Sequence, residues 1–239
     1  MVMGFINAGI MDLAQATGVI FGANIGTTIT SVLIALDVSG IAPFCICVGA
    51  FMMLYSKKAK VKHIGQVILG FGLLFQGLHT ISGAMRPLKD VIWFQEFIMN
   101  AKSPLLGLLV GAALCAVIQS SSAAVGILQA LAMQGLMPLY FASFLVCGIN
   151  IGSAMPTILA SMNARNNAKR ASMIYLINNL VGAVIMTVVT LALPYTQFIE
   201  GLIPDPMFQV SLVHIIFKVV SAAVLLPLTN QVVKLTYLL

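Results

Sequence analysis

The sequence predicts an all-α, polytopic membrane protein. Of its 239 residues, 60% are hydrophobic and only 8% are charged, and the mean hydropathy is +1.06. A water-soluble domain of this length needs more polar surface than this composition supplies. The opening stretch MVMGFINAGIMDLAQ has neither the charged start nor the cleavage site of a signal peptide, so we expect the N-terminus to belong to the fold.

Six apolar segments are long enough to cross a bilayer, which takes roughly 20 helical residues. In chain order they are 13–36, 38–55, 64–85, 138–162, 171–196 and 207–228. A further apolar stretch, 104–134, is interrupted in its middle by Gln119 and three serines. This interruption predicts a helical hairpin that dips into the membrane and returns.

Residues 86–103 separate the two halves of the chain. They mix charges with Trp93, Phe94 and Phe97 at helical spacing, a pattern typical of an interfacial amphipathic connector.

Cysteines fall only within apolar stretches, where small buried hydrophobic side chains are expected rather than disulfides or a zinc site. They are Cys45, Cys47, Cys115 and Cys147.

Basic residues crowd two loops, 56–63 and 163–170. By the positive-inside rule both loops are predicted to be cytoplasmic. The chain between them holds two predicted crossings, 64–85 and 138–162, so the hairpin must make no net crossing. The net charge of +6 is then a topology signal, and no nucleic-acid partner is expected.

An internal repeat links the two halves. GIMDLAQATGVIFGANIG at 9–26 matches GLMPLYFASFLVCGINIG at 135–152 with a constant offset of 126 residues. Three crossings separate equivalent points, so the copies are predicted to be inverted. The predicted division is a first inverted repeat, 1–85, the connector, 86–103, and a second inverted repeat, 104–239. Inverted repeats with discontinuous helices are the architecture of many secondary transporters.

The repeated motif also predicts an ion site. Gly22 and Gly26 permit a helix to unwind at membrane depth, where a cavity can satisfy the freed backbone groups. Nearby neutral oxygens suit a weakly hydrated alkali cation; they belong to Asn24, Thr27 and Thr28. Close helix packing through small residues is the alternative. Recurrence of the motif as GINIGS at 148–153 favours the ion site.

The serines at the centre of the hairpin predict an anion site. If the second arm begins near Ser121 or Ser122, its N-terminus presents free N–H groups and a positive dipole end. Three consecutive hydroxyls can donate hydrogen bonds to a tetrahedral oxyanion. A serine cap on an ordinary turn is the alternative.

The sequence resembles the type II sodium/phosphate cotransporters and their bacterial members. The resemblance rests on QSSSA at 119–123, GANIGTTIT at 22–30, GINIGS at 148–153, ILGFGLLFQGL at 68–78 and NAKRASMIYLINNLVG at 167–182. It implies inward phosphate transport coupled to sodium by alternating access in the plasma membrane, the inner membrane of a bacterium. Sodium is the only metal implied, no cofactor is, and pairing into a homodimer is left open.

The resemblance also assigns residues. Phosphate ligands would be Ser120, Ser121 and Ser122. Sodium ligands would be Gln119, Asn150 and Ser153 from the second copy and Asn24, Thr27 and Thr28 from the first.

Three departures qualify the resemblance. The first copy's QSSS motif would fall upstream of Met1, which leaves a non-transporting membrane sensor or scaffold as the alternative. Ala154, Met155 and Pro156 replace hydroxyl residues, and Pro156 predicts a helix break. Lys218 stands where family members often have asparagine. It is interpreted as a tethered cation at a sodium position, as a phosphate counter-charge, or as a lysine in a wet vestibule.

An enzyme is not expected. An intramembrane hydrolase would use one serine of the turn as nucleophile and His214 or Lys218 as base, yet no acid is positioned to orient His214. All six carboxylates lie in loops or near segment ends, so a proton relay at membrane mid-depth has no carrier.

Overall fold

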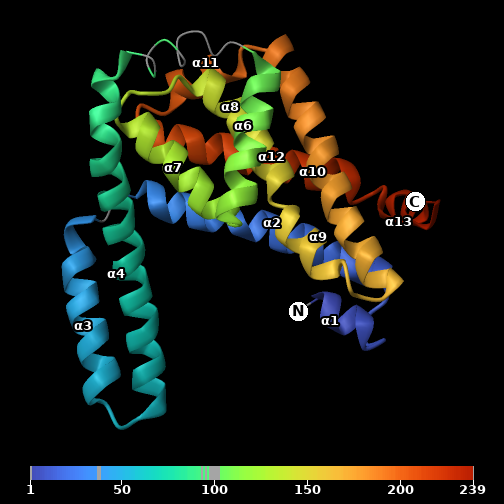
Figure 1. Cartoon of the computed structure of the whole chain (residues 1–239), viewed down its shortest axis with the longest axis horizontal. Helices are drawn as coiled ribbons and strands as arrows, with labels where there is room; N and C mark the ends of the chain where they lie inside the picture. The colour runs from blue at the N-terminus through green and yellow to red at the C-terminus, as the bar shows by residue number, and fades with distance from the viewer. Residues whose placement is uncertain (1, 37–38, 93, 95, 97–102, 239) are drawn as a thin grey trace.

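The chain folds into α-helices joined by short turns (Figure 1). The computed structural model describes residues 2–36, 39–92, 94, 96 and 103–238. Within these residues the predicted all-α class is confirmed. The helices are α1 (Val2–Asn7), α2 (Leu13–Ala35), α3 (Ala42–Tyr55), α4 (Ala59–Met85), α6 (Pro104–Ile118), α7 (Ser121–Met133), α8 (Leu139–Gly152), α9 (Met155–Ser161), α10 (Asn166–Ala192), α11 (Tyr195–Leu202), α12 (Pro206–Leu225) and α13 (Thr229–Leu238), with 3-10 turns at Ser39–Ile41 and Arg86–Asp90.

Five helical segments in the described part of the chain are long and apolar enough to cross a membrane. They are α2, α4, α10, α12 and the α8–α9 pair, Leu139–Ser161. The prediction of a polytopic membrane protein is confirmed. The sixth predicted crossing, 38–55, falls short, because α3 has 14 residues and spans about 21 Å at 1.5 Å per residue. Proline near its first residue favours this late start, and α3 lies beside α4 in a hairpin that projects from the body (Figure 1).

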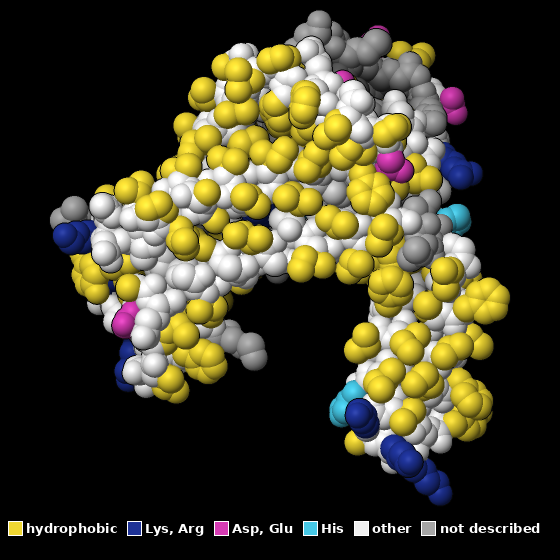
Figure 2. Space-filling model, turned by 180° about the vertical axis from the view of Figure 1, so that it is seen from behind, with side chains coloured by type: hydrophobic (Ala, Val, Ile, Leu, Met, Phe, Trp, Pro, Cys, Tyr) yellow, Lys and Arg dark blue, Asp and Glu magenta, His cyan; other side chains and the backbone are white. Residues whose placement is uncertain are grey.

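The surface of the molecule is largely apolar. Figure 2 shows hydrophobic side chains over the body and along the projecting hairpin, with Lys and Arg side chains at the hairpin tip. Phe44 and Val67, on the two arms of that hairpin, are 72% and 73% exposed. Large apolar side chains at such exposure need a lipid or protein environment.

The predicted hairpin in 104–134 is present as two helices, α6 and α7, joined at residues 119–120, while its dip into the membrane stays a prediction. Its first arm packs against α8 through glycines, Gly107 and Gly111 on α6 and Gly148 and Gly152 on α8. A Cβ atom added at Gly148 would overlap the Leu108 carbonyl oxygen and lie 2.9 Å from the Ala112 nitrogen. The two backbones are therefore in direct contact, as small residues four apart allow in membrane helices.

The predicted unwinding of 22–28 is wrong, because α2 continues through both glycines. The hydroxyls of Thr27 and Thr28 donate to the carbonyls of Asn24 and Ile25 at 2.7 and 2.8 Å. They are satisfied by the preceding turn and need no opened backbone. Glycine permits an unwound conformation without forcing one.

The predicted break in the second copy is confirmed. Helix α8 ends at Gly152 and α9 begins at Met155, with Ser153 and Ala154 between them. Pro156 occupies the second position of α9, where its missing N–H is tolerated. The copies therefore differ in their backbone at the shared motif.

The matched segments still share local features. Gly9 and Gly135, paired by the offset of 126, both have left-handed backbones, with φ of 71° and 68°. Asn24 and Asn150 are both buried. The inverted relation of the copies and the boundaries 1–85, 86–103 and 104–239 stay predictions.

The predicted connector lies partly outside the described residues, including Trp93 and Phe97. Phe94 packs against the apolar cluster formed by α7, α8 and α12. Burial is confirmed for Cys115 and Cys147, whereas Cys45 is half-buried and Cys47 is exposed.

Candidate functional site

Two residues, Gln119 and Ser120, form the turn between α6 and α7. Gln119 has a left-handed backbone, φ 59°, and its N–H donates to the Cys115 carbonyl at 2.7 Å. Ser120 caps α7, because its hydroxyl oxygen accepts from the Ala123 N–H at 3.3 Å. Its hydroxyl hydrogen remains available to donate. The second arm begins at Ser121, as predicted.

A cavity of about 330 Å³ adjoins this turn. Ser120 of the turn and Ser122 of α7 line it, as do Thr30 of α2 and Gly77 of α4, and most of the remaining lining is aliphatic. Ser121 does not line it. The start of α7 thus offers two hydroxyls and a positive dipole end to a small, partly open cavity.

Three membrane helices and the break between α8 and α9 contribute to a continuous chain of hydrogen bonds. Lys218 of α12 donates through Nζ to Oδ1 of Asn24 on α2. Asn24 donates through Nδ2 to Oδ1 of Asn179 on α10 at 3.2 Å, and Asn179 donates to Ser153 Oγ at 3.2 Å. The Ser153 hydroxyl lies 2.9 Å from that of Tyr175. We call Lys218, Asn24, Asn179, Ser153 and Tyr175 the polar chain.

The polar chain meets α8 where that helix ends. Ser153 Oγ donates to the Asn150 carbonyl at 2.7 Å, and Asn150 Nδ2 donates to the Val146 carbonyl at 2.8 Å. The side-chain oxygens of Asn150 and Asn178 are buried and have no hydrogen-bond donor within the described structure. Buried carbonyl oxygens without donors are suited to bind a cation or a water molecule.

A second buried cluster joins α2, α7 and α12. Nε2 of Gln129 on α7 lies 2.9 Å from the Ser31 carbonyl oxygen and 2.8 Å from Ser211 Oγ. Nδ1 of His214 lies 3.3 Å from Ser31 Oγ. This cluster ties the serine-capped helix to the two helices that supply Asn24 and Lys218.

A cavity of about 400 Å³ opens onto the polar chain. Asn24 and Thr27 of α2, Thr157 of α9 and Tyr175 of α10 supply its polar lining. Part of the predicted ion site therefore faces open space.

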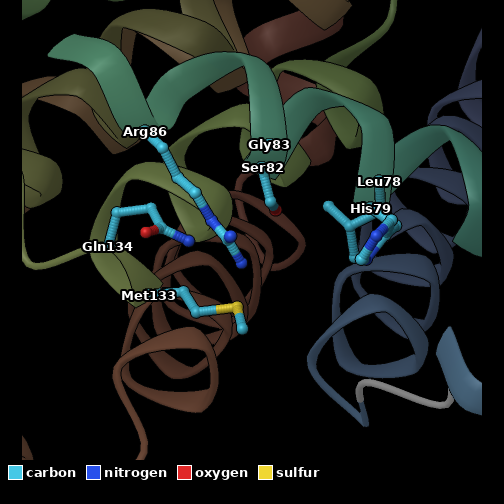
Figure 3. Close-up of a pocket in the computed structure, with 7 residues that line it drawn as sticks. All are labelled: Leu78, His79, Ser82, Gly83, Arg86, Met133 and Gln134. Carbon is cyan, nitrogen blue, oxygen red and sulfur yellow. The ribbon is translucent and has the colours of Figure 1, made fainter.

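A third cavity, of about 290 Å³, lies where α4 ends and α7 ends (Figure 3). Figure 3 shows the Arg86 side chain, directly after α4, extending toward Met133 at the end of α7 and Gln134 just beyond it, with His79 on α4. None of its lining residues was predicted as a site residue.

The structure groups some predicted ligands and separates others. Asn24 and Ser153, predicted as sodium ligands from different copies of the repeat, are linked by Asn179. Thr28 is buried on α2, and its hydroxyl bonds to its own helix. Gln119 is exposed at the turn, and in the described structure its side chain makes no hydrogen bond to Asn150 or Ser153.

The sequence did not single out Asn178, Asn179 or Tyr175. All three lie in the stretch NAKRASMIYLINNLVG, so two adjacent asparagines inside an apolar span were the available signal. An amide in a membrane helix needs a polar partner, and that need could have identified them.

Comparison with known proteins shows the family to which the chain is similar. A family described as Na+/Pi-cotransporter matches residues 1–83 and 93–222. "Uncharacterized protein YqeW" of Bacillus subtilis (strain 168) is 31% identical over 248 residues, covering 100% of this chain and 77% of the relative. "Putative inorganic phosphate export protein YjbB" of Escherichia coli (strain K12) is 27% identical over 239 residues, covering 98% of this chain.

The chain spans 43% of the length of that Escherichia coli relative. No solved structure matches this chain significantly. The family match extends over both halves of the chain and includes the serine turn and both copies of the repeated motif. The chain belongs to the Na+/Pi-cotransporter family.

Proposed function

We propose that this chain carries inorganic phosphate across a membrane, coupled to sodium ions, by alternating access. Membership of the Na+/Pi-cotransporter family and the phosphate export named for the Escherichia coli relative support the substrate. The observation that carries the proposal is the start of α7, where Ser120 and Ser122 line a cavity shared with α2 and α4.

Phosphate binds at that helix start. The hydroxyls of Ser120 and Ser122 donate to its oxygens, and Ser121 supplies a backbone N–H of the first turn. The rest of the cavity lining is mainly aliphatic and offers few competing polar groups, which strengthens these bonds by lowering the local polarity. The hairpin turn therefore selects an anion by hydrogen bonding.

Sodium binds to neutral oxygens near the break between α8 and α9. Asn150 and Asn178 have side-chain oxygens without donors, and Ser153 lies between the two helices. From the first copy we propose Thr27 and Thr28, and Thr27 lines the cavity of about 400 Å³ together with Asn24, whose side-chain oxygen accepts a hydrogen bond from Lys218. Gln119 belongs to this set if the turn closes toward α8 during transport.

The proposed orientation places loops 56–63 and 163–170 on the cytoplasmic side of the plasma membrane. Lys57 and Lys58 lie exposed at the tip of the α3–α4 hairpin, where a charged interface can solvate them. The resemblance implies inward movement of phosphate, and the name of the Escherichia coli relative implies export. The transport assay is therefore run with sodium gradients in both directions.

Uptake of radiolabelled phosphate into liposomes that contain the purified chain tests the proposal. Sodium gradients should drive flux that potassium gradients do not. Ser122→Ala removes one donor to a charged ligand, worth about 1.5–3 kcal/mol, so apparent phosphate affinity should fall about 10- to 100-fold. Ser103→Ala is the matched control, because Ser103 precedes the other hairpin arm, is exposed and makes no capping bond.

Equal phosphate affinities for Ser122→Ala and the wild type would contradict the serine site. The alternative function is a non-transporting membrane sensor or scaffold, and the unbroken α2 favours it, because an unwound segment is present in only one copy. A sensor binds phosphate in equilibrium measurements and moves none. Binding with no flux under either sodium gradient would therefore replace the transport proposal.

A further inference from the structure

Lys218 is a fully buried lysine in the middle of a membrane-spanning helix. Its exposed fraction is 0%, and Nζ donates to Asn24 Oδ1. Nζ also lies 6.0 Å from the centroid of the Phe217 ring. A buried ammonium ordinarily has an anionic partner, because removing the charge from water is strongly unfavourable.

No carboxylate in the described part of the chain supplies that partner. Five of the six acidic residues are described, and all five are exposed: Asp12, Asp90, Glu96, Glu200 and Asp205. Asp37 lies outside the described residues. The groups facing Lys218 are neutral side chains, Asn24 on α2 and the Cys115 thiol on α6, with His214 one turn earlier on α12.

Helix α6 links the surroundings of Lys218 to the serine turn. Cys115, within electrostatic range of Lys218, accepts the N–H of Gln119 through its carbonyl, so one turn of α6 separates this region from the serine turn. The hydrogen bond between Gln129 and Ser211 connects α7 to α12. The helix that carries Lys218 is therefore bonded to the helix whose start forms the proposed phosphate site.

We propose that the Lys218 ammonium is a built-in cation that occupies the position of one sodium ion beside Asn24. This inference rests on the proposed function, since it assigns a role within the same site. The ammonium and sodium carry the same charge and bind the same kind of neutral amide oxygen. Because Asn24 Oδ1 already accepts from Nζ, sodium cannot take that oxygen as a ligand. This chain then moves one sodium ion fewer per phosphate than a homologous transporter that has a neutral residue at the position of Lys218.

Lys218→Asn tests the inference, because it removes the fixed charge and adds an amide oxygen. Purified protein is reconstituted in liposomes with the membrane potential clamped at zero. The sodium gradient that balances each of several phosphate gradients is then measured. The slope of the logarithm of the phosphate gradient against that of the sodium gradient equals the number of sodium ions per phosphate. This slope should rise by one in Lys218→Asn and stay unchanged in Lys234→Asn, the exposed control on α13.

An unchanged slope in Lys218→Asn overturns the inference. If the wild type moves no phosphate, the proposed function fails, and a second measurement still decides the role of Lys218. The thermal unfolding midpoint in detergent is compared in sodium chloride and choline chloride. Sodium should raise the midpoint more for Lys218→Asn than for the wild type or Lys234→Asn, because a new sodium position has opened. Equal rises in all three proteins overturn the inference independently of flux.

Discussion

The two copies of the glycine motif predict opposite effects of the same substitution. Gly148 and Gly22 are equivalent in the repeat, and each precedes an asparagine by two residues. At Gly148 an added Cβ meets the backbone of α6, whereas at Gly22 it meets nothing within 4 Å. Gly148→Ala and Gly22→Ala therefore add the same methyl group to a packed and to an open helix face.

The size of the expected change in the free energy of unfolding follows from the contact distances. Beyond its overlap with the Leu108 carbonyl, the Cβ at Gly148 lies 2.9 Å from the Ala112 nitrogen, and ordinary contact begins at 3.4 Å. Helices α6 and α8 must therefore separate by at least 0.5 Å, which disturbs the neighbouring contacts at Gly111 and Gly152 as well. Overpacking of this kind costs about 1–3 kcal/mol. Gly22→Ala instead gains about 0.5–1 kcal/mol, because alanine is the better helix former.

The free energy of unfolding is measured for both variants by titration with sodium dodecyl sulfate from mixed micelles. Gly148→Ala should unfold at lower detergent fraction than the wild type, and Gly22→Ala at the same or higher fraction. Equal destabilisation by both substitutions would refute the reasoning, because it would mean that the open face of α2 is packed in the protein. Stability unchanged in Gly148→Ala would show that α6 and α8 are not in backbone contact.

Two further predictions concern the polar chain. Asn179→Ala removes three hydrogen bonds, of 3.2, 3.3 and 3.2 Å. Each such bond in a membrane is worth about 0.6 kcal/mol, so the substitution should lower the free energy of unfolding by about 2 kcal/mol. The same titration checks this against Asn167→Ala, an exposed control on the same helix, and equal unfolding of the two variants would contradict it. Asn150→Ala loses one bond to its own helix, so it should change stability by about 1 kcal/mol or less. It should nevertheless reduce apparent sodium affinity at least about tenfold, since a bond to a charged ion is worth about 1.5–3 kcal/mol, and unaltered sodium dependence of phosphate flux would remove Asn150 from the ion site.

Local chemistry made several elements predictable. The run Gln119–Ser122 interrupts an apolar stretch with good capping residues, so a turn and a new helix start follow from adjacent residues. Pro156 likewise predicts the break after α8, because proline cannot continue a helix into its interior but is tolerated in a first turn. Both features appear in the structure where the sequence predicted them.

The error at 22–28 shows the limit of a shared motif. Gly22, Asn24 and Gly26 match Gly148, Asn150 and Gly152, yet only the second copy ends its helix there. Thr27 and Ser153 act alike, because each donates to the carbonyl of the asparagine three residues earlier. The residues after them differ, since Thr28 also bonds back to α2 while the second copy continues into alanine, methionine and proline. The predicted crossing at 38–55 fails for a related reason, because hydropathy measures how apolar a segment is and not where its helix begins.

Apolar length, the hairpin turn and the break before α9 were determined by the sequence, because each depends on residues within a few positions of one another. Tertiary structure alone decided which polar groups meet. Lys218 and Asn24 are 194 residues apart, and Asn179 joins Asn24 to Ser153 across three segments. A buried polar group must find a partner, but helix packing chooses that partner, and the hydropathy of each helix contains no information about how its neighbours are arranged.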